Sequence, residues 1–246
     1  MTKFYATVCL PPTAPRKIPK AVAAALAPYD LNLGRELNPV GRWDWWAIRA
    51  GGACLVLPQY EGDRRLVTAS TVPRRKADLG PLGPLECYGG PRGLLDFDGM
   101  RQRAGHSYDA LLDAWTGLSA EHPPARPLTE FLARHEADPE GYSAEEARKD
   151  HLAQPLVQEV AQRAVAGDPH FGMSFLVNDP VAYFAGEHGE ARMWAVRGAV
   201  PNHALVTLDG AWTDAGTEGA GYWERADRLL DGLDAETVVL NVLCHS

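Results

Sequence analysis

Hydrophobic runs near both ends of the chain predict two strands of one sheet. Residues 4–10 are mostly β-branched, aromatic or apolar, and Pro11-Pro12 ends the run, a pattern typical of a strand. Residues 237–245 form a second run with few polar positions. A strand this apolar is usually central in its sheet and covered on both faces. We therefore expect the first and last strands to share a central sheet.

A tryptophan-rich stretch between them predicts a further strand. Asn38-Pro39 marks a turn, and residues 43–48 follow it with three tryptophans in four positions. Strand alternation would place Trp43 and Trp45 on one face. Asp44 and Trp46 would then lie on the opposite face, so only one of the two sets would line a given cleft.

Glycine-containing turns predict two hairpins. Gly51-Gly52 favours a reversal that would pair residues 53–57 with the tryptophan-rich strand. Asp209-Gly210 is a second turn signal, between the apolar residues 203–208 and residues 211–213. Residues 171–177 are apolar enough for a strand or a buried loop.

Helical signals fill the middle of the chain. The expected helices are residues 18–26, a helix from Asp96 through Trp115 with breaks, and residues 128–135, 156–166, 190–196 and 223–230. Ser143 and Glu146 have the spacing of a capping box and predict another helix start. Gly167 is placed to end a helix.

This order of elements predicts an α+β fold. We expect a single domain over residues 1–246, with a mostly antiparallel central sheet that joins the N- and C-terminal strands and has helices on one face. Residues 96–167 would form a helical insertion. Residues 59–93, rich in proline, glycine and arginine, would form an irregular flap-like segment or a poorly ordered insertion.

Composition narrows the classes of partner. A net charge of −8 and a pI near 5.5 make broad binding to nucleic acid unexpected. No apolar run is long enough for a membrane span, and the N-terminus lacks the pattern of a signal peptide. The four cysteines are scattered, which favours reduced thiols and a cytoplasmic location. Abundant alanine, arginine, glycine and proline with little lysine are typical of high-GC genomes, such as those of actinobacteria.

Histidines and carboxylates supply a candidate metal site. In an extended segment, His188 and Glu190 would present two ligands on one face, and His203 or His245 would complete a facial triad. Two histidines and one carboxylate with open positions are typical of non-heme Fe(II) oxygenases. The alternative is a solvated loop that enters a helix.

Aromatic residues supply a candidate substrate site. Stacking walls for a flat ring would come from Trp43, Trp45, Trp46, Tyr222 and Trp223. Arg42 or Asp44 would fix the polar edge of that ring. The alternative is a core aromatic cluster in which Asp44 caps a turn or pairs with an arginine.

Three patches of the chain resemble an uncharacterised family of actinobacteria and their phages. Asn38-Pro39 followed by residues 42–45 is similar to the family's N-P-x-x-K-W-D-W motif, and Cys244-His245 is similar to its C-terminal D-C-H-I. The hairpin at residues 208–212 also fits. The chain departs from the family at residues 49–52, where a Gly-Gly-Arg-Trp is usual, and at Leu243, where an acid is usual. The resemblance implies positions and no activity.

Three functions stay open from the sequence. The first is an Fe(II)-dependent oxygenase of natural product biosynthesis that acts on a small, flat, heterocyclic and nucleoside-like substrate, with Asp44 and His245 as catalytic residues. The second is a non-enzymatic, phage- or plasmid-linked binding module that uses the tryptophan-rich face. The third is a metal-free isomerase or lyase with Asp44 as the base. The sequence leaves the oligomeric state open.

Overall fold

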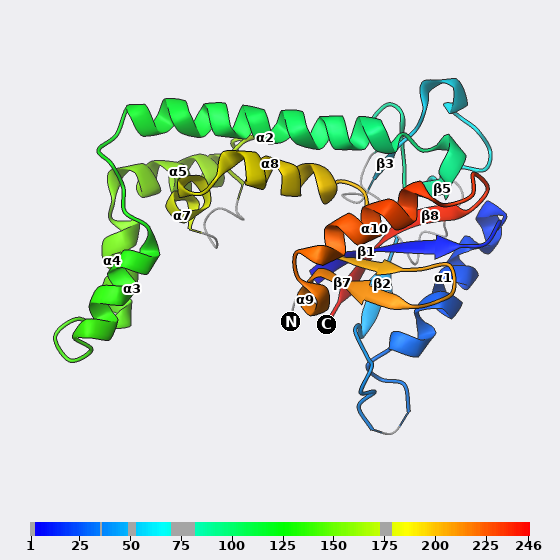
Figure 1. Ribbon diagram of the computed structural model, residues 1–246, viewed down its shortest axis with the longest axis horizontal. Helices are drawn as coiled ribbons and strands as arrows, with labels where there is room; N and C mark the ends of the chain where they lie inside the picture. The colour runs from blue at the N-terminus through cyan, green and yellow to red at the C-terminus, as the bar shows by residue number, and fades with distance from the viewer. Residues whose placement is uncertain (1–2, 35, 49–52, 70–81, 173–178) are drawn as a thin grey trace. The chain divides into compact units, whose positions relative to one another are not determined.

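A computed structural model of the chain describes residues 3–34, 36–48, 53–69, 82–172 and 179–246 (Figure 1). The chain divides into two compact units. Residues Met1–Arg103 and Val196–Ser246 form the sheet unit, and Ala104–Ala195 form the helical unit. The expectation of a single domain over 1–246 stays a prediction.

The sheet unit contains the central sheet that the two terminal strands predicted. In the described residues, the strands are β1 (Lys3–Leu10), β2 (Trp45–Ala47), β5 (Gly89–Pro91), β6 (Ala204–Val206), β7 (Trp212–Asp214) and β8 (Val238–His245). Their order is β2-β8-β1-β6-β7, and β5 also pairs with β8. β1 and β8 are antiparallel over eight residue pairs, whereas β1 and β6 are parallel. The α+β class is confirmed.

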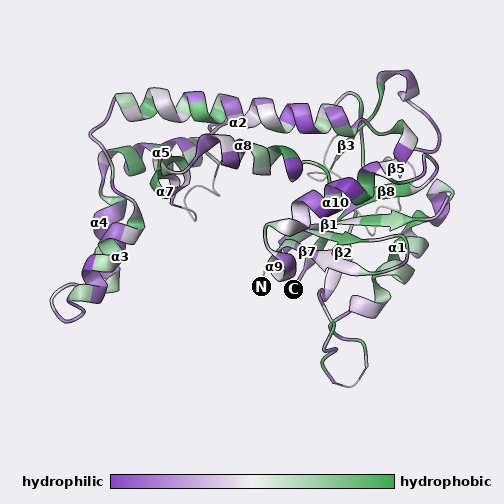
Figure 2. Cartoon of the chain, viewed as in Figure 1, coloured by the Kyte–Doolittle hydropathy of each residue, from purple (hydrophilic) through white to green (hydrophobic). Residues whose placement is uncertain are grey.

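Helices cover both faces of this sheet, which corrects the expectation of helices on one face. α1 (Ile18–Leu26) packs in one core cluster with the even-numbered positions of β1. α10 (Gly221–Asp231) packs in a second cluster, which contains Cys9. Figure 2 colours β1 and β8 largely green, hydrophobic, as expected for strands covered on both sides.

The first expected hairpin is wrong, and the second is confirmed. β3 (Cys54–Leu55) pairs with β4 (Glu86–Cys87) rather than with β2. β2 pairs instead with the end of β8. β6 and β7 form the second predicted hairpin. The turn at 51–52 lies outside the described residues.

The ends of the expected flap-like segment pack into the sheet unit. Val67 bridges Gly89, and Tyr88 is buried at 1% exposure. Residues 70–81 lie outside the described residues. Short helical turns connect the strands: η1 (Pro15–Lys17), η2 (Ala27–Tyr29), η3 (Pro58–Tyr60), η5 (Arg92–Leu94) and α9 (Ala215–Glu218).

The helical unit follows the local signals closely. Its helices are α2 (Phe97–Ala120), which begins in the sheet unit, α3 (Leu128–Ala137), α4 (Ala144–Leu152), α5 (Pro155–Ala166), α7 (Pro180–Ala185) and α8 (His188–Arg197), which ends in the sheet unit. Ser143 and Glu146 form the predicted capping box, and Gly167 ends α5 in the left-handed conformation. α2 is a continuous helix, which corrects the expected breaks.

The structure also bears on the predicted segment 171–177, the cysteines and the membrane prediction. Phe171 is fully buried, while residues 173–178 lie outside the described residues. All four cysteines are buried and free. Within the described ranges, none of the helices combines the length and apolarity that crossing a membrane requires.

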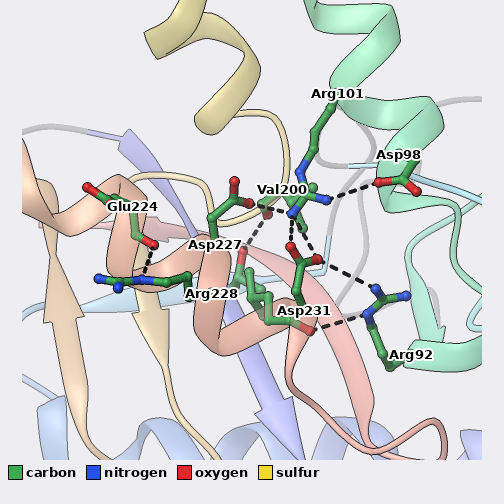
Figure 3. Close-up of polar contacts among 10 residues, drawn as sticks. Arg92, Asp98, Arg101, Val200, Glu224, Asp227, Arg228 and Asp231 are labelled. Carbon is green, nitrogen blue, oxygen red and sulfur yellow. Dashed lines mark hydrogen bonds and ion pairs between the residues drawn. The ribbon is translucent and has the colours of Figure 1, made fainter.

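Ion pairs connect α2 and α10 within the sheet unit (Figure 3). Nη2 of Arg101 lies 2.7 Å from an Asp227 oxygen and 2.9 Å from Asp231, and Nη1 lies 3.2 Å from Asp98. Arg92 also approaches Asp231, at 3.6 Å. Burial raises the pKa of Asp227, and the hydrogen bond from Arg101 opposes that rise. Arg101 therefore holds a half-buried carboxylate in its charged form.

We expect Arg101→Met to destabilise the protein by about 1–3 kcal/mol, because Asp227 then loses its compensating charge. Without Arg101, the folded-state pKa of Asp227 rises further above its unfolded value. A raised folded-state pKa means that stability present at low pH is lost as pH rises. The deficit should therefore be larger near pH 7 than near pH 4 in urea unfolding.

Arg65→Met is the matched control, because Arg65 forms ion pairs with Asp63 and Glu236 and is 46% exposed. Exposed pairs contribute about 1 kcal/mol or less. Equal losses of unfolding free energy in the two variants would contradict the role assigned to Arg101. A loss of stability in Arg101→Met that is independent of pH would also contradict it.

Candidate functional site

Asp44 and His245 meet at the end of the central sheet. β2 pairs with the last residues of β8, so Trp45 lies opposite His245 and Asp44 comes just before the strand. The Asp44 amide donates to the His245 carbonyl at 2.9 Å. The side chains of the same two residues are also in contact: Nδ1 of His245 lies 2.7 Å from Oδ1 of Asp44. The two side chains are 20% and 39% exposed, so solvent and small molecules have access to them.

The chemistry of this contact assigns the proton on the ring. A carboxylate only accepts hydrogen bonds, so Nδ1 of His245 carries the hydrogen. In the neutral ring, Nε2 then has a free lone pair. A histidine oriented by a carboxylate in this way is equipped to accept and return a proton.

A cavity of about 590 Å³ lies in the sheet unit, and neither Asp44 nor His245 is among the residues that line it. Arg42 and Ser246 line it, and they are close chain neighbours of Asp44 and His245. Lys3 also lines it and lies opposite His245 in the β1–β8 ladder. The remaining lining comes from Phe4, His203, Trp212, Asp214 and the first turn of α9.

Aromatic rings form one wall of the cavity. Phe4 makes edge contacts with His203 at 5.7 Å and with Trp212 at 6.2 Å between ring centroids. Tyr29 packs against Trp212 at 5.2 Å and donates its hydroxyl to the Gly210 carbonyl. These contacts hold Trp212 in place, so the wall is preformed.

Asp214 contributes a side-chain carboxylate to the cavity, and both of its oxygens accept hydrogen bonds. Oδ1 accepts from the Thr217 amide at 2.7 Å, and Oδ2 accepts from the Trp212 indole at 2.9 Å. Nε of Arg42 lies 4.0 Å from Oδ2, the outer limit of an ion pair. Burial raises the pKa of Asp214, but the hydrogen bonds and Arg42 lower it by more, so it lies below its usual value.

We expect Asp214→Ala to destabilise the sheet unit by about 1–2 kcal/mol, since α9 loses its N-cap and Trp212 loses its acceptor. A lowered folded-state pKa gives stability that is present above the unfolded pKa and is lost as pH falls through the folded value. The variant should therefore differ from the natural chain near pH 7 and much less near pH 2, in denaturant unfolding. Glu36→Ala, at an exposed position, is the control. An equal loss of unfolding free energy in that variant would contradict the stabilising role assigned to Asp214.

The tryptophan-rich segment is mostly core. Trp43 is 7% exposed and donates its indole N–H to the Leu26 carbonyl at 3.0 Å. Trp46 is 8% exposed, and both rings belong to the same core cluster. The expected alternation is therefore wrong for Trp43, which precedes β2 and bridges Asp30 instead. Trp45 is the exposed member, at 44%.

Tyr222 and Trp223 do not join that segment. Both lie on α10, where Tyr222 belongs to the core cluster that contains Cys9, on the other face of the sheet, and Trp223 packs against that cluster. Tyr222 is fully buried and donates to the Pro201 carbonyl at 3.0 Å. Burial raises the pKa of its hydroxyl. The core alternative describes these two rings better than a substrate wall does.

The four candidate metal ligands have separate environments. His188 and Glu190 lie on α8, which corrects the expected extended segment. Positions two apart on a helix point roughly 200° apart around its axis, and Glu190 accepts from the Trp194 indole. His203 contacts Phe4, and His245 contacts Asp44. Among the described residues, no group of three histidine, cysteine or acidic side chains is arranged to hold a metal.

Sequence reasoning selected Asp44 and His245, and of the cavity lining it selected Arg42 and His203 and missed the rest. Phe4 and Trp212 read as ordinary strand residues. Asp214 carries a local signal, because an aspartate three residues before Thr217 is typical of a helix N-cap. That signal marks a helix start and says nothing of a cavity.

Comparison with known proteins finds no matching family model, curated protein or solved structure. The resemblance to the uncharacterised actinobacterial and phage family stays a prediction.

Proposed function

We propose that the sheet unit is an enzyme in which His245 acts as a general base on a small molecule, without a metal. The 2.7 Å contact between Nδ1 of His245 and Asp44 carries this proposal. The contact orients the ring and leaves Nε2 able to take a proton. The proposed place for the substrate is the cavity that Arg42 and Ser246, chain neighbours of the pair, help to line.

The proposed step is proton transfer from carbon, as in an isomerase or a lyase. The C–H bond of the substrate breaks, its proton goes to Nε2 of His245, and the electron pair stays on the substrate beside a carbonyl or carboxyl group. Asp44 stabilises the imidazolium that forms. This changes the third hypothesis from the sequence: His245 replaces Asp44 as the base, and Asp44 becomes the residue that positions it.

The Fe(II)-dependent oxygenase stays a prediction that has gained no support. It needs His188 or His203 together with Glu190 or Asp44 and His245 around one ion. The described residues show Asp44 bound to His245 by a hydrogen bond and Glu190 bound to Trp194. The proton-transfer proposal uses contacts that already exist.

Deuterium exchange tests the proposal even when the product is unidentified. The full chain is incubated in D₂O with a panel of enolisable carboxylic acids, ketones and amides, and proton NMR follows the loss of each C–H signal. We expect exchange at one carbon of at least one compound class. Exchange in none of them, or at the rate of buffer alone, would contradict the proposal.

Exposure of Trp45 supports a second candidate, the binding module. An indole that is 44% exposed on the short strand β2, beside Asp44 and His245, is suited to contact another molecule. In that case Trp45→Ala would abolish partner binding in a folded protein, and His245→Ala would leave that binding unchanged. Deuterium exchange that depends on His245 favours the enzyme.

A further inference from the structure

We infer that the cavity binds a planar aromatic or heteroaromatic carboxylate. This inference rests on the proposed function and names the class of substrate that would occupy this cavity. Three features support it: the cationic side chains of the lining, the hydrogen bonds that Asp214 already accepts, and the aromatic wall.

Two cationic side chains line the cavity in a chain whose net charge is −8. Lys3 and Arg42 contribute an ammonium and a guanidinium group. Within the described part of the chain, the guanidinium of Arg42 makes no hydrogen bond, and the carboxylate oxygen paired with it is 4.0 Å away. A guanidinium of this kind is well suited to hold a carboxylate through two N–H donors.

Asp214 limits the charge of the ligand. Its oxygens already accept from Thr217 and Trp212, so it is not set up to receive an ammonium group from a ligand. It also places one negative charge beside Arg42, so that among the side chains of the lining the two cations Lys3 and Arg42 accompany one carboxylate. This balance favours a monoanion over a dianionic phosphate.

The aromatic wall favours a flat ligand. Phe4 and Trp212 are held by edge contacts with each other and with their neighbours. The volume of about 590 Å³ is within the range of small-molecule sites and suits one or two rings. A ring against this wall and a carboxylate at Arg42 would satisfy both parts of the lining.

Calorimetric titration with a matched pair of probes tests the inference. Indole-3-carboxylate carries the proposed charge, and indole-3-carboxamide has nearly the same shape without it. We expect the acid to bind at least about tenfold more tightly than the amide, the usual size of a charge-assisted hydrogen bond. Equal affinities, or no binding of either probe, would overturn the inference.

Variants of single cationic residues test whether the acid binds in this cavity. Arg42→Gln should weaken the acid about tenfold and leave the amide unchanged. Lys20→Gln removes the same charge from an exposed position on α1 and should change neither. Equal weakening by both variants would assign the effect to net charge and would overturn the inference. Circular dichroism confirms that each variant is folded.

The two proposals fail separately. His245→Gln should retain the preference for the acid, because Arg42 is unchanged. Carboxylate binding without any deuterium exchange would retain the cavity assignment and contradict the proton-transfer function. Deuterium exchange that depends on His245, together with equal affinity for acid and amide, would support the proton-transfer function and contradict the carboxylate site in the cavity.

Discussion

Replacing His245 with glutamine is expected to lower the rate of deuterium exchange by about 10²–10⁴-fold, the usual contribution of a positioned general base. Glutamine keeps a polar group at the end of β8 and has no nitrogen that accepts a proton. His245 is the last residue of β8, and its side chain is partly exposed. We therefore expect the variant to remain folded, with an unchanged urea midpoint.

Asp44→Asn separates positioning from simple structural support. An asparagine amide donates to Nδ1 and favours the opposite tautomer, in which Nε2 carries the hydrogen and cannot act as a base. Exchange should fall by about 10²-fold or more while the affinity for the carboxylate probe stays unchanged. His170→Gln, at an exposed position in the helical unit, is the control. Full activity in both His245→Gln and Asp44→Asn would contradict the role of the pair.

Gly89→Ala is expected to destabilise the sheet unit by about 3–5 kcal/mol. Gly89 has a φ of +146°, a conformation that side chains rarely adopt. A Cβ there would lie 2.4 Å from Cβ of Leu240 and 2.4 Å from the Val239 carbonyl oxygen. Both contacts belong to β8, so the strand that carries His245 would have to move. Chemical denaturation measures the loss.

Gly62→Ala isolates the backbone part of this effect. Gly62 also has a positive φ, of +75°, but a Cβ there would have nothing within 4 Å. We expect a loss of about 1 kcal/mol from backbone strain alone. If the two substitutions cost the same, close packing of β5 against β8 is not what requires glycine at position 89.

Local signals were sufficient for elements whose stability depends on neighbouring residues. The helix at residues 18–26, the capping box of Ser143 and the stop at Gly167 all appear as expected. Caps and stops act through hydrogen bonds within one helical turn. The β6–β7 hairpin follows the same logic, because its turn residues set the pairing.

Pairing between distant segments was less predictable. β2 was expected to pair with residues 53–57, across a short glycine turn, and pairs instead with β8. The entropic cost of closing a loop rises only logarithmically with its length, by about 0.6 kcal/mol per doubling, so packing can outweigh it. The choice of partner therefore depends on packing of the whole sheet. The two buried tryptophans of the segment show the same dependence, because their burial requires α1 and β8 around them.

The sequence by itself determined that this chain forms an α+β fold from two apolar terminal strands, and it singled out Asp44, His245, Arg42 and His203 one by one. Only the tertiary structure decided which of them meet. Asp44 and His245 are 201 residues apart in the chain, and β2 must pair with β8 before their side chains touch. Phe4, Trp212 and Asp214 have no shared pattern in the sequence, because a cavity wall is assembled from separate strands. Local signals report hydrogen bonds between near neighbours, whereas a site depends on contacts that exist only once the sheet has formed.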